Sequence, residues 1–325
     1  MKAIVIQAFG GPENLVIQEI SDPETKPDHV VITVKAFGVN HAETHMRKGE
    51  WAESVKVSGV ECVGVVKADP SGKLAPGQKV FALMGGMGRT IFGSYAEQTC
   101  VPASNVVPFE SDLAWAELAA IPESYATAWP CLFSNLELRA GQVLLLRGAT
   151  SALGQAALNI AAHAGARVIA TTRRSDRFPL LTGMGAEHVL IEGSELPAQV
   201  RALFPDGVDR VLDLVGNSVV LSSLGLVRRG GRVCEAGWLG GLAPIAAFNP
   251  LLQMPSGVHF SLFGSFMFGL PGFPLSEVPF QTIVDHVANG TYRARPARIF
   301  RFDEIQAAHR LMESNEAGGK IVVTL

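Results

Sequence analysis

The segment GATSALG, residues 148–154, has the small side chains needed for a turn that lies close to a phosphate group. A glycine-rich turn before a helix lets backbone N–H groups and the helix N-terminus bind a pyrophosphate. The middle glycine of the usual pattern is replaced here by Ser151 and Ala152. We still predict a pyrophosphate site, formed by Gly148, Ala149, Thr150, Ser151, Ala152, Leu153 and Gly154.

The residues about 20 positions after this turn bear on the choice of dinucleotide. Thr172, Arg173 and Arg174 stand where sites for NAD usually carry an Asp or Glu that binds the ribose 2′-hydroxyl. Guanidinium groups bind a phosphate dianion well, so the sequence favours NADPH over NADH, with Arg173 and Arg177 as the expected phosphate ligands. A solvated strand end is the alternative interpretation, and only the preceding turn argues against it.

The elements around the turn predict one βαβ unit. Residues 143–146 form an apolar run typical of a buried parallel strand, and residues 167–172 resume as strand. Between them, apolar residues recur at helical spacing: Leu153, Ala156, Ala157, Ile160 and Ala164, with Gly165 as a left-handed cap.

Four further strands are predicted at 188–191, 209–215, 232–236 and 258–262, with helices at 196–204 and 218–227. Strands alternating with helices build a doubly wound parallel sheet of the Rossmann type, which binds ligands at the carboxyl ends of its strands. We therefore expect five further cofactor contacts just after these strands: Val215, Gly216, Gly237, Trp238 and Phe263.

The residues before and after this predicted Rossmann region show a different pattern of strands and helices. Short β-like runs at 2–8, 30–37, 60–68 and 79–83, separated by turns such as GGPE and DPSG, indicate a β-rich, barrel-like domain. Helices are predicted at 277–288 and 303–314, before a last strand at 320–324 that needs a partner. We expect this tail to return to the N-terminal domain, so that residues 1–121 and 265–325 form one domain and residues 122–264 the other.

Composition limits the functional classes. The 325 residues are 48% hydrophobic and 18% charged, with a net charge of −3, which indicates a folded two-domain protein without nucleic acid or a membrane as a partner. No charged N-region followed by an apolar segment opens the sequence, so we expect a cytosolic protein. The four cysteines are far apart, which predicts buried free thiols: Cys62, Cys100, Cys131 and Cys234.

Ten segments, in this order, carry a family resemblance: MKAIVIQAFGGPENL, FGVNHAETHMRKGEW, VSGVECVGVV, PGQKVFAL, GSYAEQTCVPASNVVPF, IPESYATAWPCLF, GATSALG, DLVG, GGRVCEAG and GGKIVVTL. Through them the chain resembles the zinc-independent quinone oxidoreductase branch of the medium-chain dehydrogenase/reductase family. The resemblance implies an N-terminal GroES-like domain, a Rossmann domain, a cofactor cleft between them, and a homodimer joined through the Rossmann sheets.

The resemblance also argues against a metal. Zinc-dependent relatives have a cysteine where Asn40 stands and Gly-His-Glu where this chain has Gly59-Val60-Glu61, and nothing resembles their lobe of four cysteines. His41 and His45 could share one helix face, but a metalloprotease needs its Glu directly after the first His. We therefore interpret HAETH as a polar turn leading into the cleft.

Without a metal, hydride from a nicotinamide would reach a carbon that conjugation already makes electrophilic, as in a quinone or an enone. By resemblance, Asn40 is the cleft asparagine, and His45 takes the place of a tyrosine near the nicotinamide, as a proton donor, a substrate contact or a solvated histidine. Tyr125 and Thr127 resemble residues that line the nicotinamide pocket, although Tyr125 suits core packing equally well.

Two sets of residues complete the expected site. Lys320 could approach the nicotinamide, but a surface role is favoured for it. An aromatic substrate wall could involve Trp238 and Phe263 and, as the substrate residues, Trp51, Phe92 and Phe266. The leading hypothesis is an NADPH-dependent quinone or enone reductase. The alternatives are an enoyl-thioester reductase and a cofactor-binding protein with little catalytic activity.

Overall fold

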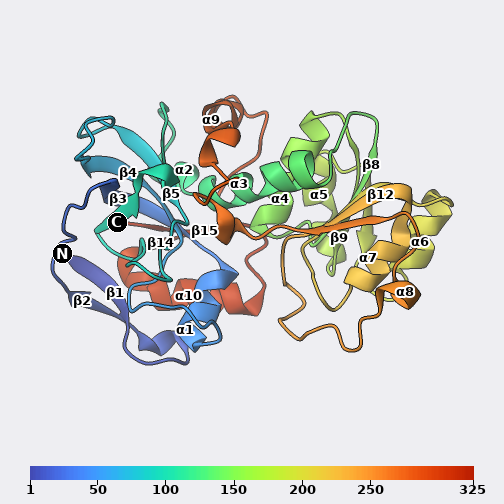
Figure 1. Cartoon of the computed structure of the whole chain (residues 1–325), viewed down its shortest axis with the longest axis horizontal. Coiled ribbons are helices and arrows are strands. Elements are labelled where there is room, and N and C mark those ends of the chain that lie inside the picture. Colours follow the sequence, from blue (N-terminus) through green and yellow to red (C-terminus); the bar gives the residue numbers. More distant parts are fainter. The chain divides into compact units, whose positions relative to one another are not determined.

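The computed structural model describes residues 1–325, which divide into two compact units. The first unit comprises Met1–Ala126, Ser265–Gly290 and Ala294–Leu325, and the second comprises Thr127–Gly264 with Thr291–Arg293. Both units and their labelled elements can be followed in Figure 1. None of the helices is long and apolar enough to span a bilayer.

The second unit is built on a six-stranded sheet with the order β10-β9-β8-β11-β12-β13. Every neighbouring pair of strands is parallel. The order changes direction between β8 and β11, which is the switch point where doubly wound sheets bind ligands. The predicted Rossmann-type sheet is thus confirmed, with strands β8 (Val143–Arg147), β9 (Arg167–Thr172), β10 (His188–Ile191), β11 (Val208–Asp213), β12 (Val227–Glu235) and β13 (His259–Leu262).

Helices cover both faces of this sheet. Leu145 packs with Leu196 of α6 and Leu224 of α7 in one core cluster, while its strand neighbours Leu144 and Leu146, whose side chains point to the opposite face, are also fully buried. The helices are η3 (Cys131–Asn135), α4 (Ala152–His163), η4 (Ser175–Arg177), α5 (Phe178–Gly183), α6 (Leu196–Leu203), α7 (Val220–Leu226) and α8 (Pro250–Gln253).

The first unit is a β-rich domain. Its seven-stranded sheet has the order β14-β15-β3-β4-β5-β7, with β6 paired to β3, and β1 and β2 form a separate antiparallel pair. Strand β15 runs antiparallel to β3, so the chain's last strand does find its partner in the N-terminal region. The strands are β1 (Lys2–Ile6), β2 (Leu15–Glu19), β3 (His29–Val39), β4 (Glu61–Ala68), β5 (Lys79–Leu83), β6 (Gln98–Pro102), β7 (Val106–Pro108), β14 (Arg298–Arg301) and β15 (Ile321–Thr324).

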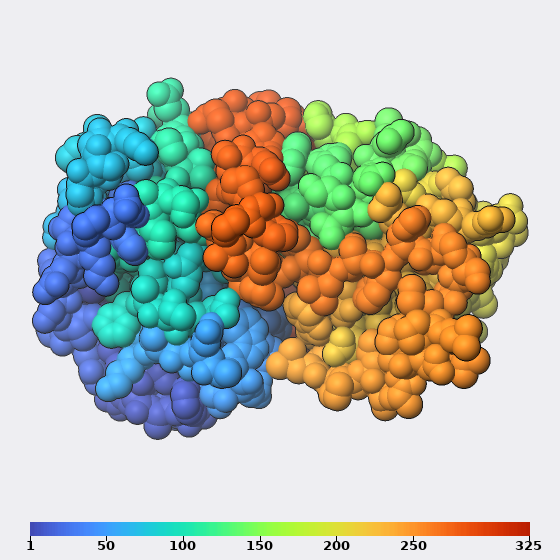
Figure 2. Space-filling model, viewed as in Figure 1, coloured from blue at the N-terminus to red at the C-terminus, as the bar shows by residue number.

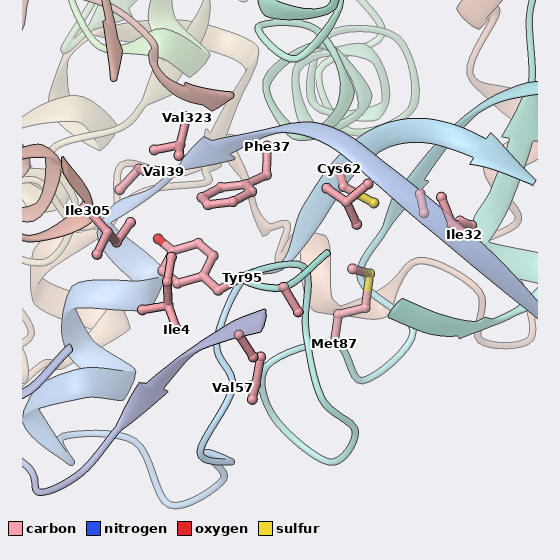
Figure 3. Packing of buried hydrophobic residues seen from close by; sticks show 14 of the residues in the cluster. Ile4, Ile32, Phe37, Val39, Val57, Cys62, Met87, Tyr95, Ile305 and Val323 are labelled. Carbon is pink, nitrogen blue, oxygen red and sulfur yellow. The ribbon is translucent and has the colours of Figure 1, made fainter. Parts of the chain in front are cut away.

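The core of this unit gathers alternate residues of β3 and its neighbours around two aromatic rings. Phe37 and Tyr95 stack with their ring centroids 4.6 Å apart. Figure 3 shows the two rings side by side. Ile4, Cys62 and Val323 bring β1, β4 and β15 into the same cluster. This cluster holds the sheet edge that carries the polar residues described below.

The helices of the first unit are η1 (Pro12–Asn14), α1 (His41–Lys48), η2 (Ala103–Asn105), α2 (Trp115–Leu118), η5 (Ser265–Met267), η6 (Leu275–Glu277), α9 (Phe280–Ala288), η7 (Phe302–Glu304) and α10 (Ile305–Ser314). Helix α3 (Pro122–Pro130) spans the change from the first unit to the second. The interpretation of HAETH as a polar turn is wrong, since it opens α1. The Glu43 side chain accepts the Asn40 backbone N–H at 2.9 Å, which caps the helix N-terminus.

Candidate active site

The GATSALG turn has two positions that only glycine fits. Gly148 has φ +78°, in the left-handed region, and a Cβ on Gly154 would lie 2.5 Å from the Gly148 carbonyl oxygen. The N-terminus of α4 therefore lies directly against the end of β8. This close approach is the feature that the outer glycines of a dinucleotide turn provide.

Ser151 takes over part of the role of the missing middle glycine. Its hydroxyl donates to the Gly148 carbonyl at 2.9 Å and accepts the Gly154 N–H at 3.0 Å, so it caps α4 and closes the turn. The N–H groups of Thr150, Ala152 and Leu153 donate to no acceptor in the chain. Because these free donors lie at a helix N-terminus, the turn fits a pyrophosphate despite its altered pattern.

The arginines after β9 differ in what they contact. Arg174 forms a double hydrogen bond with Asp176, at 3.0 Å and 2.6 Å. Arg173 is exposed and forms no hydrogen bond or ion pair, and Arg177 is partly buried. Thr172 is buried, and the neighbouring Thr171 hydroxyl accepts the Gly148 N–H at 3.2 Å, which ties this strand end to the turn. Arg173 is therefore the guanidinium available to an anion.

A buried polar network that the sequence analysis did not identify lies at the ends of β8 and β11. Arg147 forms an ion pair with Glu192 and donates to the Ser223 hydroxyl at 2.9 Å. That hydroxyl donates to Asp213 at 2.6 Å. A charged residue closing an apolar strand, as in VLLLR and RVLD, was the signal in the sequence.

This network positions the loop after β11, and that loop contacts the loop after β12. Asp213 accepts the backbone N–H groups of Val215 and Gly216, each at 2.9 Å. A Cβ on Gly216 would lie 2.5 Å from the Gly237 carbonyl oxygen and 3.1 Å from the Trp238 ring, so the loops after β11 and β12 are in contact. Phe263 follows β13 and is buried, with its N–H bonded to the Glu235 carbonyl at 2.9 Å. The structure thus brings these predicted residues together along one sheet edge.

A second polar cluster, in the first unit, surrounds Asn40. The Asn40 amide donates to Glu61 at 2.9 Å, and its oxygen accepts from Lys320 at 2.6 Å. Lys320 also forms an ion pair with Glu61. The expected surface role for Lys320 is wrong, because the residue is only 4% exposed. Burial lowers the pKa of Lys320, but the charge of Glu61 outweighs this and the pKa is raised overall.

Glu43 completes this cluster and was also missed by the sequence analysis. Its carboxyl accepts the backbone N–H groups of Asn40, at 2.9 Å, and Val60, at 3.1 Å. Burial raises the pKa of Glu43 to about 7, and the nearby charge of Glu61 adds to this. Glu43 and Glu61 therefore hold Asn40 from both its backbone and its side chain.

The remaining predicted residues come from several segments of the chain. His45 binds Glu50 through Nδ1 and stacks on Trp51 with ring centroids 5.9 Å apart, and 21% of its side chain is exposed. Phe266 is exposed and lies beneath the Arg89 guanidinium at 5.4 Å, while Phe92 is exposed on another segment. Tyr125 and Thr127 of α3 are both buried, which for Tyr125 agrees with the core-packing interpretation.

The structure contains no group of three or more His, Cys, Asp or Glu side chains arranged to hold a metal ion. All four cysteines are free, and three of them are buried. Cys100 differs from the expectation because it is partly exposed.

Comparisons with known proteins agree with this geometry. The model of the alcohol dehydrogenase GroES-like domain matches residues 26–111, and the model described as zinc-binding dehydrogenase matches residues 152–276. Quinone oxidoreductase of the rat, Rattus norvegicus, is 29% identical over 273 residues, which cover 82% of this chain and 81% of the rat protein.

Solved structures share the whole architecture. An NAD-dependent alcohol dehydrogenase is 27% identical with a TM-score of 0.86, and the match covers 100% of both chains. A mycobacterial protein complexed with NADPH superimposes with a TM-score of 0.88 over 100% of both chains, at 23% identity, and so shows the fold. The fold and the site thus define an oxidoreductase with a GroES-like and a Rossmann domain. The chain belongs to the medium-chain dehydrogenase/reductase family, as a quinone oxidoreductase-like member.

The buried ion pair gives a test of how the Asn40 cluster contributes to stability. Lys320→Met should lower the free energy of unfolding by about 3–5 kcal/mol, because Glu61 would remain buried without a counter-charge. Urea unfolding followed by tryptophan fluorescence measures this. Lys73→Met, at an exposed lysine, is the control, with an expected change within about 0.5 kcal/mol. Adding Glu61→Gln to Lys320→Met should recover part of the loss. A loss below about 1 kcal/mol for Lys320→Met would show that the pair is not required.

Proposed function

We propose that this chain is an NADPH-dependent reductase that transfers a hydride to a quinone or an α,β-unsaturated carbonyl compound without a metal. The observation that carries the proposal is the free guanidinium of Arg173 beside a turn that offers unpaired N–H groups. NADPH carries two phosphate-bearing parts, a 2′-phosphate and a pyrophosphate. In this proposal Arg173 binds the 2′-phosphate and the turn binds the pyrophosphate. An acidic residue, which would favour NADH, does not occupy that place.

The two domains have separate roles in this proposal. Residues 122–264 bind the dinucleotide, through Gly148 to Gly154 and the loops after β11, β12 and β13. Residues 1–121 with 265–325 supply Asn40 and His45, and Trp51, Phe92 and Phe266 contact the substrate. NADPH, when bound, supplies the hydride from C4 of its nicotinamide.

The chemistry follows from the donors that the first unit supplies. Zinc-dependent relatives have a cysteine ligand where this chain has Asn40 and a histidine ligand where it has Val60. The side chains of Asn40 and Val60 cannot replace these ligands. The substrate must therefore already be electrophilic, and the protein stabilises the charge that develops on its oxygen through hydrogen bonds. The Asn40 amide donates to Glu61 and Glu43 and accepts from Lys320, so in this proposal it exchanges one of its two donor bonds for the substrate oxygen. His45 donates a proton from Nε2, since Nδ1 is bound to Glu50.

Quinones are the first substrate class in the proposal because the relative with the highest identity reported above is named for them. Small enones follow from the same chemistry. Enoyl thioesters need in addition an entry for a pantetheine arm, which makes them the second candidate.

We also propose a homodimer formed through the edge of the Rossmann sheet. Strand β13 pairs only with β12, so its other edge is unpaired, and Leu262 on it is exposed. Leu251 and Leu252 of α8 are 88% and 79% exposed. They belong to the segment of residues 239–257, which lies on the surface in orange in Figure 2. An unpaired edge beside exposed leucines favours pairing with the same edge of a second copy.

Cofactor choice tests the role of Arg173. Arg173→Ala should reduce the preference for NADPH over NADH by about tenfold to a hundredfold, because the 2′-phosphate loses charge-assisted hydrogen bonds. Dissociation constants of both cofactors, measured by fluorescence titration, give this ratio. Arg174→Ala is the matched control, since Arg174 is already paired with Asp176, and it should change the ratio less than about threefold. An unchanged ratio in Arg173→Ala contradicts the choice of NADPH.

Turnover tests the reaction class. Purified protein is assayed for NADPH oxidation with naphthoquinones, small enones and enoyl thioesters, and turnover with quinones or enones is expected. His45→Phe should lower kcat by about a hundredfold if His45 donates the proton. His29→Phe, at the partly exposed first residue of β3, serves as the control. Tight NADPH binding without turnover of any substrate would favour the cofactor-binding protein over an enzyme.

The oligomeric state tests the edge-strand proposal. Light scattering coupled to gel filtration should give twice the chain mass of 34.5 kDa. Leu251→Glu combined with Leu252→Glu should produce monomers, because two charges would enter the apolar contact. Phe9→Glu changes an exposed apolar residue in the other unit and should leave the mass unchanged. A wild-type mass of one chain would refute the dimer.

A further inference from the structure

Glu235, the last residue of β12, is an acid that the chain buries without a partner. It is 3% exposed, and its Oε1 atom has no hydrogen-bond partner. No lysine, arginine or histidine forms an ion pair with it. Buried polar atoms in folded proteins almost always have a partner, and leaving one unpaired costs about 1–3 kcal/mol. A carboxyl group kept under these conditions suggests a ligand.

The groups around Glu235 are already occupied. Asp213 lies opposite it on β11 and accepts from two backbone N–H groups and from the Ser223 hydroxyl. Arg147 on β8 is bound to Glu192 and Ser223. On the other side, β13 places Leu262 opposite Glu235, so Asp213 is the charged group that faces it. Neither Arg147 nor Asp213 is left to pair with the Glu235 carboxyl.

The Glu235 carboxyl lies against the loop that the cofactor is expected to contact. A Cβ on Gly216 would lie 3.2 Å from Glu235 Oε1, so this oxygen is directly beside the loop after β11. Gly237 and Trp238 follow Glu235 after one intervening residue, Ala236, and touch the same loop. The free acid is therefore at the carboxyl edge of the sheet, where doubly wound folds bind ligands.

The order of the strands indicates which half of a dinucleotide reaches this place. Arg173 follows β9, the GATSALG turn follows β8, and Glu235 ends β12, two strands further in the same direction. If the adenosine 2′-phosphate lies at Arg173 and the pyrophosphate at the turn, the nicotinamide half extends towards β11 and β12.

We propose that Glu235 is a cofactor-binding residue whose carboxyl group hydrogen-bonds a hydroxyl of the ribose on the nicotinamide side of the dinucleotide. This inference rests on the proposed function, because it needs the dinucleotide to bind at this sheet edge. It adds a residue and a proton requirement that the proposed function does not contain.

The protonation state of Glu235 gives the proposal its measurable consequence. Burial raises the pKa of Glu235 to about 7, and the nearby Asp213 adds to this; burial also raises the pKa of Asp213. Below this pKa the acid is neutral and can donate to the hydroxyl. Above it, a second negative charge faces Asp213 and the anionic cofactor. Cofactor affinity should therefore fall as the pH rises through about 7, and binding should take up a proton.

The experiment measures binding of NADPH and of NADH by isothermal titration calorimetry at pH 6, 7 and 8. NADH is included because the 2′-phosphate of NADPH titrates in the same range. For the wild type, the dissociation constant of each cofactor should rise about tenfold from pH 6 to pH 8. Titrations at pH 7 in buffers of different ionisation enthalpy should show proton uptake. Glu235→Gln keeps a donor and an acceptor but does not titrate, so its affinity should not follow this pH dependence.

Glu235→Leu should bind both cofactors about tenfold or more weakly than the wild type at pH 6, because it lacks the hydrogen bond. The folded-state pKa is above the unfolded value of 4.5, so the acid costs stability increasingly as the pH rises from that value towards 7. Glu235→Leu should therefore melt at a higher temperature than the wild type at pH 8. Glu195→Gln, at an exposed acid of the same unit, is the control for both measurements and should behave as the wild type.

Four outcomes overturn the proposal. Wild-type affinity that is independent of pH, or a pH dependence that persists in Glu235→Gln, contradicts it and leaves the proposed function intact. Unchanged affinity at pH 6 in a folded Glu235→Leu variant also contradicts this proposal and leaves the proposed function intact. If neither cofactor binds the wild type at millimolar concentration, both this proposal and the proposed function are wrong. Should Glu235→Leu fail to fold, the pH profile of Glu235→Gln still decides.

Discussion

The buried ion pair between Lys320 and Glu61 is the interaction on which the organisation of the first unit depends. It connects the residue before the last strand, β15, with the first residue of β4. Glu61 also accepts the Glu123 N–H at 2.8 Å, where α3 begins, and the Asn40 amide, where α1 begins. A Cβ on Gly38 would lie 2.2 Å from Glu61 Oε1, so the neighbouring strand must carry glycine there. Two charges buried together are stable only with such complete pairing.

The second unit also buries charged groups that pair with one another, but one buried acid is left without a partner. Arg147, Glu192, Ser223 and Asp213 pair with one another and with the backbone of the loops at the sheet edge. Glu235 is in the same layer but outside this network. In the Asn40 cluster every acid is satisfied by the protein itself. At the sheet edge one acid, Glu235, is not.

Local pattern was sufficient to predict most of the second unit. The strands at 167–172 and 188–191 and helix α6 depend on runs of apolar residues that the chain itself displays. The short edge strands β2, β7 and β14 were missed because their side chains are largely exposed and show little apolar pattern. The prediction of a polar turn at HAETH was wrong because these residues also show little apolar pattern. They form a helix whose N-terminus is capped by the interaction of Glu43 with Asn40.

The sequence did not show which charged side chains are buried or paired. Lys320 is expected at a surface by its type, and its burial depends on Glu61, which is distant in sequence. Arg173 and Arg174 show the opposite case, in which adjacent residues of one type differ because Asp176 is within reach of only one of them. In the sequence the two arginines are equivalent candidates for a phosphate. Of the two, only Arg174 has an ion-pair partner, because the exposed Asp176 lies two residues after it in the chain.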